Sequence, residues 1–183
     1  MRATPLAVTA LAAALLLTAC DSGGGDDGGG SGKSQGAGSG KAGDACAVGK
    51  LGIEVGPANV APGPGDSGDV PVSLTNQSAP CTLDGLPGAV LKAGDTSATV
   101  PGASDAKPEK LTLVKGESAT FTLTYVRGGA AGGKSLAAKT LSISMPGAAG
   151  DVKSFPWSYG PVALKSEGGA PDASVGPFTR AGD

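Results

Sequence analysis

Several side chains that support enzyme chemistry are scarce or missing from this sequence. It contains no histidine, so it lacks the commonest general base and the commonest metal ligand of proteins. Aromatic residues make up only 3% of the chain, so a folded core must be built mainly from Val, Leu and Ile. The formal net charge is −2, which provides no basic field for nucleic acid. We therefore expect no catalytic residues, no cofactor and no nucleic-acid partner.

The first 20 residues have the pattern of an export signal. Arg2 supplies a positive start, and an apolar stretch over residues 6–17 follows that is too short to span a bilayer comfortably. Residues 17–20 read Leu-Thr-Ala-Cys, which resembles the lipobox of bacterial lipoproteins. The resemblance implies that residues 1–19 are a lipoprotein signal peptide and that the thiol of Cys20 accepts a diacylglycerol group.

Acylation at Cys20 would decide where the protein resides. Two or three acyl chains anchor a protein durably, whereas a single chain gives only marginal membrane binding. We therefore expect the chain to be lipid-anchored at the outer, extracytoplasmic face of the cell membrane, with membrane lipid as its partner. An ordinary secretory signal with an incidental cysteine and a cytosolic protein with an apolar N-terminus are the two alternatives.

A glycine-rich segment follows the cysteine. Residues 21–44 contain 11 glycines and no large apolar side chain. Such a segment buries too little apolar surface to offset the entropy of ordering, and as a coil it would span about 25–30 Å. We predict that residues 20–44 are the lipidated cysteine and a disordered tether, and that residues 45–183 form one domain.

Apolar and polar residues alternate with period 2 in the predicted domain, as in half-buried strands. The alternation is clearest over residues 120–125, and it recurs in four further segments, 51–55, 70–74, 111–113 and 141–145. Glycine- and proline-rich turns separate these segments, and none has the pattern of a long amphipathic helix. The pattern predicts an all-β, antiparallel β-sandwich of the immunoglobulin-like kind.

Two cysteines remain once Cys20 carries lipid. Cys46 and Cys81 would then lie in an oxidising compartment, where thiols pair. We predict one disulfide between them, and two free thiols are the alternative.

Residues 72–88 read VSLTNQSAPCTLDGLPG and resemble the DUF4232 family, domains of unknown function in actinobacterial lipoproteins and secreted proteins. Residues 111–125 and 175–178 resemble later strands of the same family, so the resemblance covers about residues 45–180. Family members often carry a second cysteine pair in the C-terminal half, whereas this chain has no cysteine after Cys81. The resemblance implies an architecture and a location, and it implies no catalytic role.

Three motifs suggest binding chemistry but lack the context it needs. Residues 128–135 match the phosphate-loop pattern GxxxxGK[ST], yet a predicted strand follows instead of a helix, so we expect a hairpin loop and no nucleotide. Asp66 and Asp69 fall short of a calcium loop, so no metal site is predicted. Carboxylates for glycan hydrolysis are present, but nothing places two of them in one cleft; they are Glu54, Asp69, Asp84, Asp95, Glu109 and Glu117.

Trp157 and Tyr159 have two interpretations. They form either a surface contact for an envelope protein or glycan, or a cover over one end of the core. The favoured hypothesis is a non-enzymatic binding or accessory module of the cell envelope. The alternative is an extracellular carboxylate-dependent glycan hydrolase, which a deep pocket with two facing carboxylates would favour.

Overall fold

Antiparallel strands form nearly all of the regular structure in a computed structural model of the chain. The structure describes residues 44–59, 62–129, 134–148 and 150–182, which fall in one compact unit, Ser39–Asp183. The predicted signal peptide, Cys20 and the tether up to residue 43 lie outside the described residues.

Thirteen strands and one short 3₁₀ turn follow one another along the described residues. In chain order they are η1 (Val48–Lys50), β1 (Leu51–Val55), β2 (Ser67–Asn76), β3 (Cys81–Leu83), β4 (Gly88–Ala93), β5 (Thr96–Val100), β6 (Leu111–Leu113), β7 (Ser118–Val126), β8 (Ser135–Leu136), β9 (Thr140–Ser144), β10 (Val152–Pro156), β11 (Val162–Ala163), β12 (Ala173–Val175) and β13 (Thr179–Arg180). Within these described segments there is no α-helix, and no helix is long and apolar enough to cross a membrane.

The larger sheet has the strand order β1-β2-β7-β12, and β13 also pairs with β7. β2 and β7 are its longest strands, and they pair antiparallel over nine residue positions. Phe121, Leu123 and Tyr125 of β7 are buried, whereas the threonines between them are partly or fully exposed. The alternation in the sequence therefore separates one buried face of this sheet from one solvent face.

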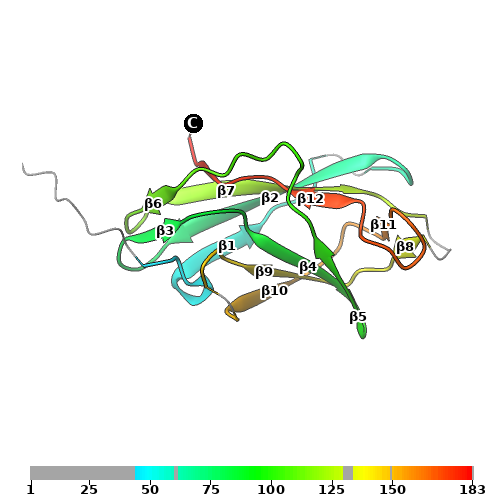
Figure 1. Ribbon diagram of the computed structural model, residues 1–183, viewed down its shortest axis with the longest axis horizontal. Coiled ribbons are helices and arrows are strands. Elements are labelled where there is room, and N and C mark those ends of the chain that lie inside the picture. The colour runs from blue at the N-terminus through cyan, green and yellow to red at the C-terminus, as the bar shows by residue number, and fades with distance from the viewer. Residues whose placement is uncertain (1–43, 60–61, 130–133, 149, 183) are drawn as a thin grey trace, which may run out of the picture. The chain divides into compact units, whose positions relative to one another are not determined.

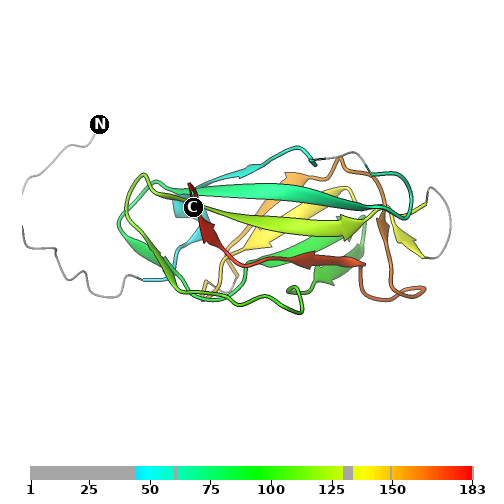
Figure 2. The ribbon, with the colours of Figure 1, turned by 90° about the horizontal axis from the view of Figure 1, so that it is seen from above.

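The second large sheet has the order β10-β9-β4-β5. It lies as a second layer across from the first, as the two views show (Figure 1, Figure 2). Leu91 of β4 and Leu141 and Ile143 of β9 are buried in the same apolar cluster as the inward residues of β7. One core between two sheets is the arrangement of a β-sandwich.

Two small sheets close the ends of the domain. β3 pairs with β6 near the start of β7, and β8 pairs with β11 near its end. Figure 1 shows these small sheets at opposite ends of the layered domain. β7 therefore runs from one end of the domain to the other. The residues at its start lie beside one small sheet, and the residues at its end lie beside the other.

The predicted disulfide is confirmed. Cys46 and Cys81 are bonded, and their Cα atoms lie 4.9 Å apart. The bond joins the segment before β1 to the first residue of β3, where an isolated parallel bridge between Ala45 and Thr82 adds a second link. The all-β antiparallel fold and the five strands expected from the alternation are confirmed as well, whereas the immunoglobulin-like topology stays a prediction.

Candidate functional site

The candidate site is a cavity at the end of the domain where β7 finishes. Its volume is about 370 Å³. Side chains from three stretches of the chain line it, namely Pro57, Ala58, Pro62, Tyr125, Arg127, Ser158, Tyr159 and Gly160. We call it the Arg127 cavity, because this arginine is the only charged side chain among its lining residues.

Three aromatic rings form a rigid cluster beside the cavity. The rings of Trp157 and Tyr159 meet edge to face with centroids 4.8 Å apart, and Tyr125 meets Trp157 in the same way at 5.1 Å. Such edge-to-face pairs add stabilisation beyond the burial of their area. Trp157 is only 5% exposed, and Tyr159 is partly buried. Trp157 therefore packs in the core, while Tyr159 is the ring of this pair that lines the Arg127 cavity.

Backbone carbonyls satisfy the polar atoms of all three rings. Tyr125 Oη donates to the carbonyl of Tyr159 at 2.9 Å, and Trp157 Nε1 donates to that of Gly160 at 2.7 Å. Tyr159 Oη donates to the carbonyl of Gly56 at 2.5 Å. Burial raises the pKa of both tyrosines above the ordinary value of 10.0, so the phenols stay protonated and keep donating at neutral pH.

Arg127 is held in place through its backbone and through one arm of its guanidinium. Its backbone N–H donates to the backbone carbonyl of Asp66, and its own carbonyl accepts from the backbone N–H of Gly65. Nη1 donates to the carbonyl of Pro62 at 2.7 Å. Among the described residues, Nε is buried without a hydrogen-bond partner and no carboxylate forms an ion pair with this side chain. A buried donor without a partner costs about 1–3 kcal/mol of stability. The hydrogen bonds of this guanidinium therefore do not fully offset the cost of removing it from water.

Gly160 allows the backbone to approach this cation. Its φ is +88°, a conformation that disfavours other residues. A Cβ at this position would lie 3.0 Å from Arg127 Nε and 3.4 Å from its Cζ. The segment 157–160 therefore packs closely on the guanidinium because its last residue has no side chain.

The lining of the Arg127 cavity carries no negative charge. No acidic residue lines it, and none lines the neighbouring cavity of about 210 Å³, which Lys139, Trp157 and Pro161 help to form. Both statements concern the described residues alone. One guanidinium and one ammonium group line these two cavities, and no carboxylate does. The carboxylate of Asp66 lies in the adjacent loop, where it accepts from the backbone N–H of Gly63 at 3.2 Å.

A larger cavity of about 430 Å³ has a different character. Asp105, Asp172 and Lys165 line it together with several Ser and Thr residues, so both signs of charge are present. Neither carboxylate is one of the six that the sequence offered as candidates. Two carboxylates against one ammonium group give this cavity an excess of negative charge, the opposite of the Arg127 cavity.

The six candidate carboxylates are dispersed. None of the five described cavities is lined by two of them. Asp69 accepts from Thr124 Oγ1 at 2.6 Å, and Asp84 pairs with Lys110 at 3.5 Å. The other four are Glu54, Asp95 and Glu109, which are exposed, and Glu117, which belongs to the network described next.

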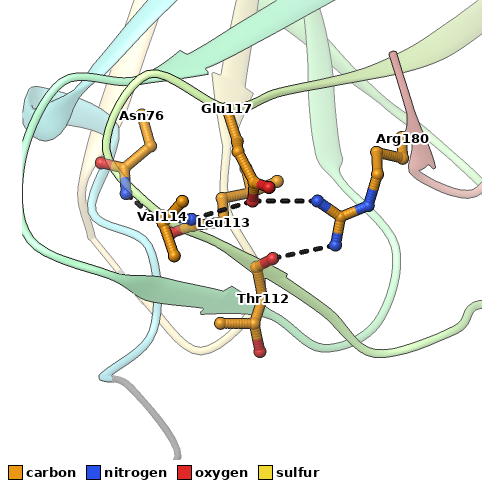
Figure 3. Close-up of polar contacts among 6 residues, drawn as sticks. All are labelled: Asn76, Thr112, Leu113, Val114, Glu117 and Arg180. Atoms are coloured by element: carbon orange, nitrogen blue, oxygen red, sulfur yellow. Dashed lines mark hydrogen bonds and ion pairs between the residues drawn. The ribbon is translucent and has the colours of Figure 1, made fainter. Parts of the chain in front are cut away.

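The start of β7 carries a second arginine site, shown in Figure 3. Glu117 accepts from the backbone N–H of Val114 at 3.0 Å and pairs with Arg180 Nη1 at 2.9 Å. Arg180 Nη2 also donates to the carbonyl of Thr112 at 3.2 Å. The hydrogen bond from Val114, followed by the bond to Arg180, lowers the pKa of Glu117 below 4.5. These contacts fasten β13 to the turn between β6 and β7 and leave no unused charge for a ligand.

Residues 46–179 match the family described as a domain of unknown function, DUF4232. The chain belongs to this family. The match runs from the disulfide cysteine Cys46 to Thr179, the first residue of β13, so it includes Arg127 and Glu117 and ends one residue before Arg180. Comparison with curated proteins found no match, and comparison with solved structures found none either.

The family segment at residues 72–88 has a structural explanation. Asn76 is 1% exposed, and its Nδ2 donates to the carbonyls of Ala79 and Leu113 at 2.9 and 2.8 Å. Its Oδ1 accepts from the backbone of Ser78 at 2.9 Å. The asparagine therefore closes the turn between β2 and β3 and ties it to β6, next to the disulfide.

The phosphate-loop motif falls partly outside the described residues, which omit 130–133. Ser135, its last residue, begins β8, and β8 pairs with β11. A strand therefore follows the glycine-rich loop, as the sequence led us to expect. The group that the sequence did not single out is Arg127, whose only local signal is its place directly after the clearest strand.

Proposed function

We propose that this chain is a lipid-anchored, extracytoplasmic binding protein of the cell envelope, with a non-enzymatic β-sandwich module on a glycine-rich tether. The observation that carries the proposal is the order of features along the chain. An apolar segment ends at Cys20, a tether without large apolar residues follows, and then comes a disulfide-bonded domain. A disulfide is typical of the oxidising side of a membrane, where acylation at Cys20 would hold the chain.

The Arg127 cavity supports a binding role for the domain. It combines apolar and polar walls in about equal parts with one cation, and a few polar groups among apolar ones are typical of a ligand site. Its hydroxyl and phenol groups have no neighbouring carboxylate or imidazole base within the lining set, so the cavity suits recognition better than nucleophilic or acid–base chemistry.

The membrane part of the proposal is tested by Cys20→Ser in the full chain, with Ser22→Ala as a matched control. We expect the Cys20→Ser variant to leave the membrane fraction and Ser22→Ala to remain in it after a high-salt wash. Mass spectrometry of the wild-type N-terminus should show an acylated Cys20. A variant that stays membrane-bound, or an unprocessed Met1, contradicts the anchor.

The binding part is tested by a photo-crosslinking residue placed at Ser158, which is exposed and lines the Arg127 cavity. A crosslinker at Ser97, an exposed residue of β5, serves as the control. On intact cells we expect one defined product from Ser158, its loss when Arg127→Gln is added, and no such product from Ser97. Identical products from both positions would show contact by proximity alone and would contradict a binding role for this cavity.

A further inference from the structure

We infer that the Arg127 cavity binds the terminal carboxylate of a peptide with small side chains. The inference rests on the proposed binding role of the domain and names the ligand class of that site. It starts from the guanidinium, which has a hydrogen bond to Pro62 but no ion pair among the described residues. A carboxylate is the group whose two oxygens match the parallel N–H donors of a guanidinium.

The guanidinium is positioned before any ligand arrives. Nη1 is fixed on the carbonyl of Pro62, and the space that a Cβ on Gly160 would need is taken by Nε and Cζ. The aromatic cluster holds the segment 157–160 in place through three hydrogen bonds to backbone carbonyls. Because these contacts form on folding, the side chain loses little further freedom when it binds an anion.

The donors around the cavity suit a monoanion better than a phosphate. Pro57 and Pro62 have no backbone N–H to offer. The hydroxyls of Tyr125 and Tyr159 already donate to backbone carbonyls. The cavity holds a single cation, whose charge matches that of one carboxylate, whereas a phosphate group carries up to two negative charges.

The remaining walls indicate what is attached to the carboxylate. Two prolines, Ala58 and two tyrosines supply the apolar half of a lining that is about equally polar and apolar, and the volume of about 370 Å³ lies in the range of small-ligand sites. This space has room for the carboxylate together with about two or three small residues. A peptide C-terminus ending in consecutive alanines fits this size and carries this charge.

The chain carries its own reporter for this site. Trp157 is its single tryptophan, and its ring touches that of Tyr159, which lines the cavity. We would titrate the full-length protein in detergent with N-acetyl-Ala-Ala and follow tryptophan fluorescence. The matched probe is N-acetyl-Ala-Ala amide, in which a neutral carboxamide of nearly the same size replaces the carboxylate. We expect saturable binding of the acid with a Kd of about 1 mM and binding of the amide weaker by about tenfold or more.

Variants place the binding at Arg127. Arg127→Gln should weaken binding of the acid by about tenfold or more, whereas Lys165→Gln, in the larger cavity of mixed charge, should leave it unchanged. Arg127→Lys should fall between wild type and Arg127→Gln, because it keeps the charge and loses the planar pair of donors. If Arg127→Gln fails to fold, the comparison of acid and amide on the wild-type protein still decides the question.

Several results would overturn the inference. Equal binding of acid and amide would show that the carboxylate is not recognised, and tighter binding of inorganic phosphate would show that another anion is preferred. Loss of binding in Lys165→Gln would move the site to the larger cavity. If neither peptide binds while Ser158 still crosslinks on cells, the carboxylate inference fails and the proposed function stands.

Discussion

Strand β7 starts beside one arginine site and ends beside another, and the two guanidinium groups differ in their ion-pair and hydrogen-bond partners. At the start, Arg180 pairs with Glu117 at 2.9 Å and also donates to a backbone carbonyl. At the end, Arg127 has one backbone carbonyl and no ion pair among the described residues. The first arginine therefore holds parts of the fold together, whereas the second is the one for which we propose a ligand.

The surroundings of the two sites follow the same division. The end near Glu117 also contains the disulfide and the buried Asn76, whose three hydrogen bonds tie the turn after β2 to β6. The end near Arg127 contains the aromatic cluster and the two cavities without acidic residues. We therefore expect changes near Glu117 to alter stability without altering binding, and only changes near Arg127 to alter binding.

Removing the disulfide should have the largest effect. The bond closes a loop with a sequence separation of 35 residues. A loop of this length predicts a loss of about 4 kcal/mol of unfolding free energy for the Cys46→Ala, Cys81→Ala double variant, measured by denaturant titration. In the fraction that stays folded, binding of N-acetyl-Ala-Ala should be unchanged. A loss of binding there would contradict the claim that the disulfide end of the domain affects stability and not binding.

Asn76→Ala should have the next largest effect. The substitution removes three hydrogen bonds and leaves the buried carbonyl of Leu113 without this donor. We expect a loss of about 2–4 kcal/mol in unfolding free energy. The exposed neighbour Gln77→Ala is the control, with an expected change within about 0.5 kcal/mol. Equal losses in the two variants would refute the structural role of the asparagine.

Gly160 and Gly116 offer a matched pair across the two ends. Both have a φ of +88°, but a Cβ at Gly116 meets nothing within 4 Å, while one at Gly160 meets the guanidinium of Arg127. Substitution by alanine should cost about 1 kcal/mol at Gly116 from backbone strain alone, and more at Gly160. Binding of the peptide acid should weaken in Gly160→Ala only. If both variants bind like wild type, the close approach at Gly160 does not position the arginine.

The smallest expected effect concerns pH. The pKa of Glu117 is lower in the folded chain than its ordinary value of 4.5, so its stabilising contribution is present above that value and is lost as the pH falls through the lowered one. Because the pair is exposed, the effect is small. The denaturation midpoints of wild type and Glu117→Gln should differ near neutral pH and converge in acid. A difference that persists in acid would show that protonation of Glu117 is not the cause.

The sequence predicted the parts of the fold that have a regular pattern. β7 was found because Phe121, Leu123 and Tyr125 alternate with threonines, and the disulfide followed from the count of cysteines. β10 was missed because it is mostly exposed on both faces, with Val152 at 54%, so no apolar period marks it. Strands of two residues, such as β8, β11 and β13, are too short to show any period.

The candidate site could be predicted only in part, since its contacts join distant segments. Trp157 and Tyr159 were singled out as rare aromatic residues. Arg127 was not singled out, because its hydrogen bond to Pro62 joins residues 65 positions apart and no local sequence pattern indicates that bond. The absence of an ion pair is a property of the folded structure, and a sequence does not show which charges end up beside each other.

The most direct test of the contrast between the two arginines is an NMR titration of their side chains. The full chain contains three arginines, Arg2, Arg127 and Arg180, so their Nε–Hε signals can be assigned by substitution. On addition of N-acetyl-Ala-Ala, the account predicts that the Arg127 signal shifts saturably while the Arg180 signal stays in place. A shift of the Arg180 signal, or no shift at Arg127 at saturating peptide, would contradict it.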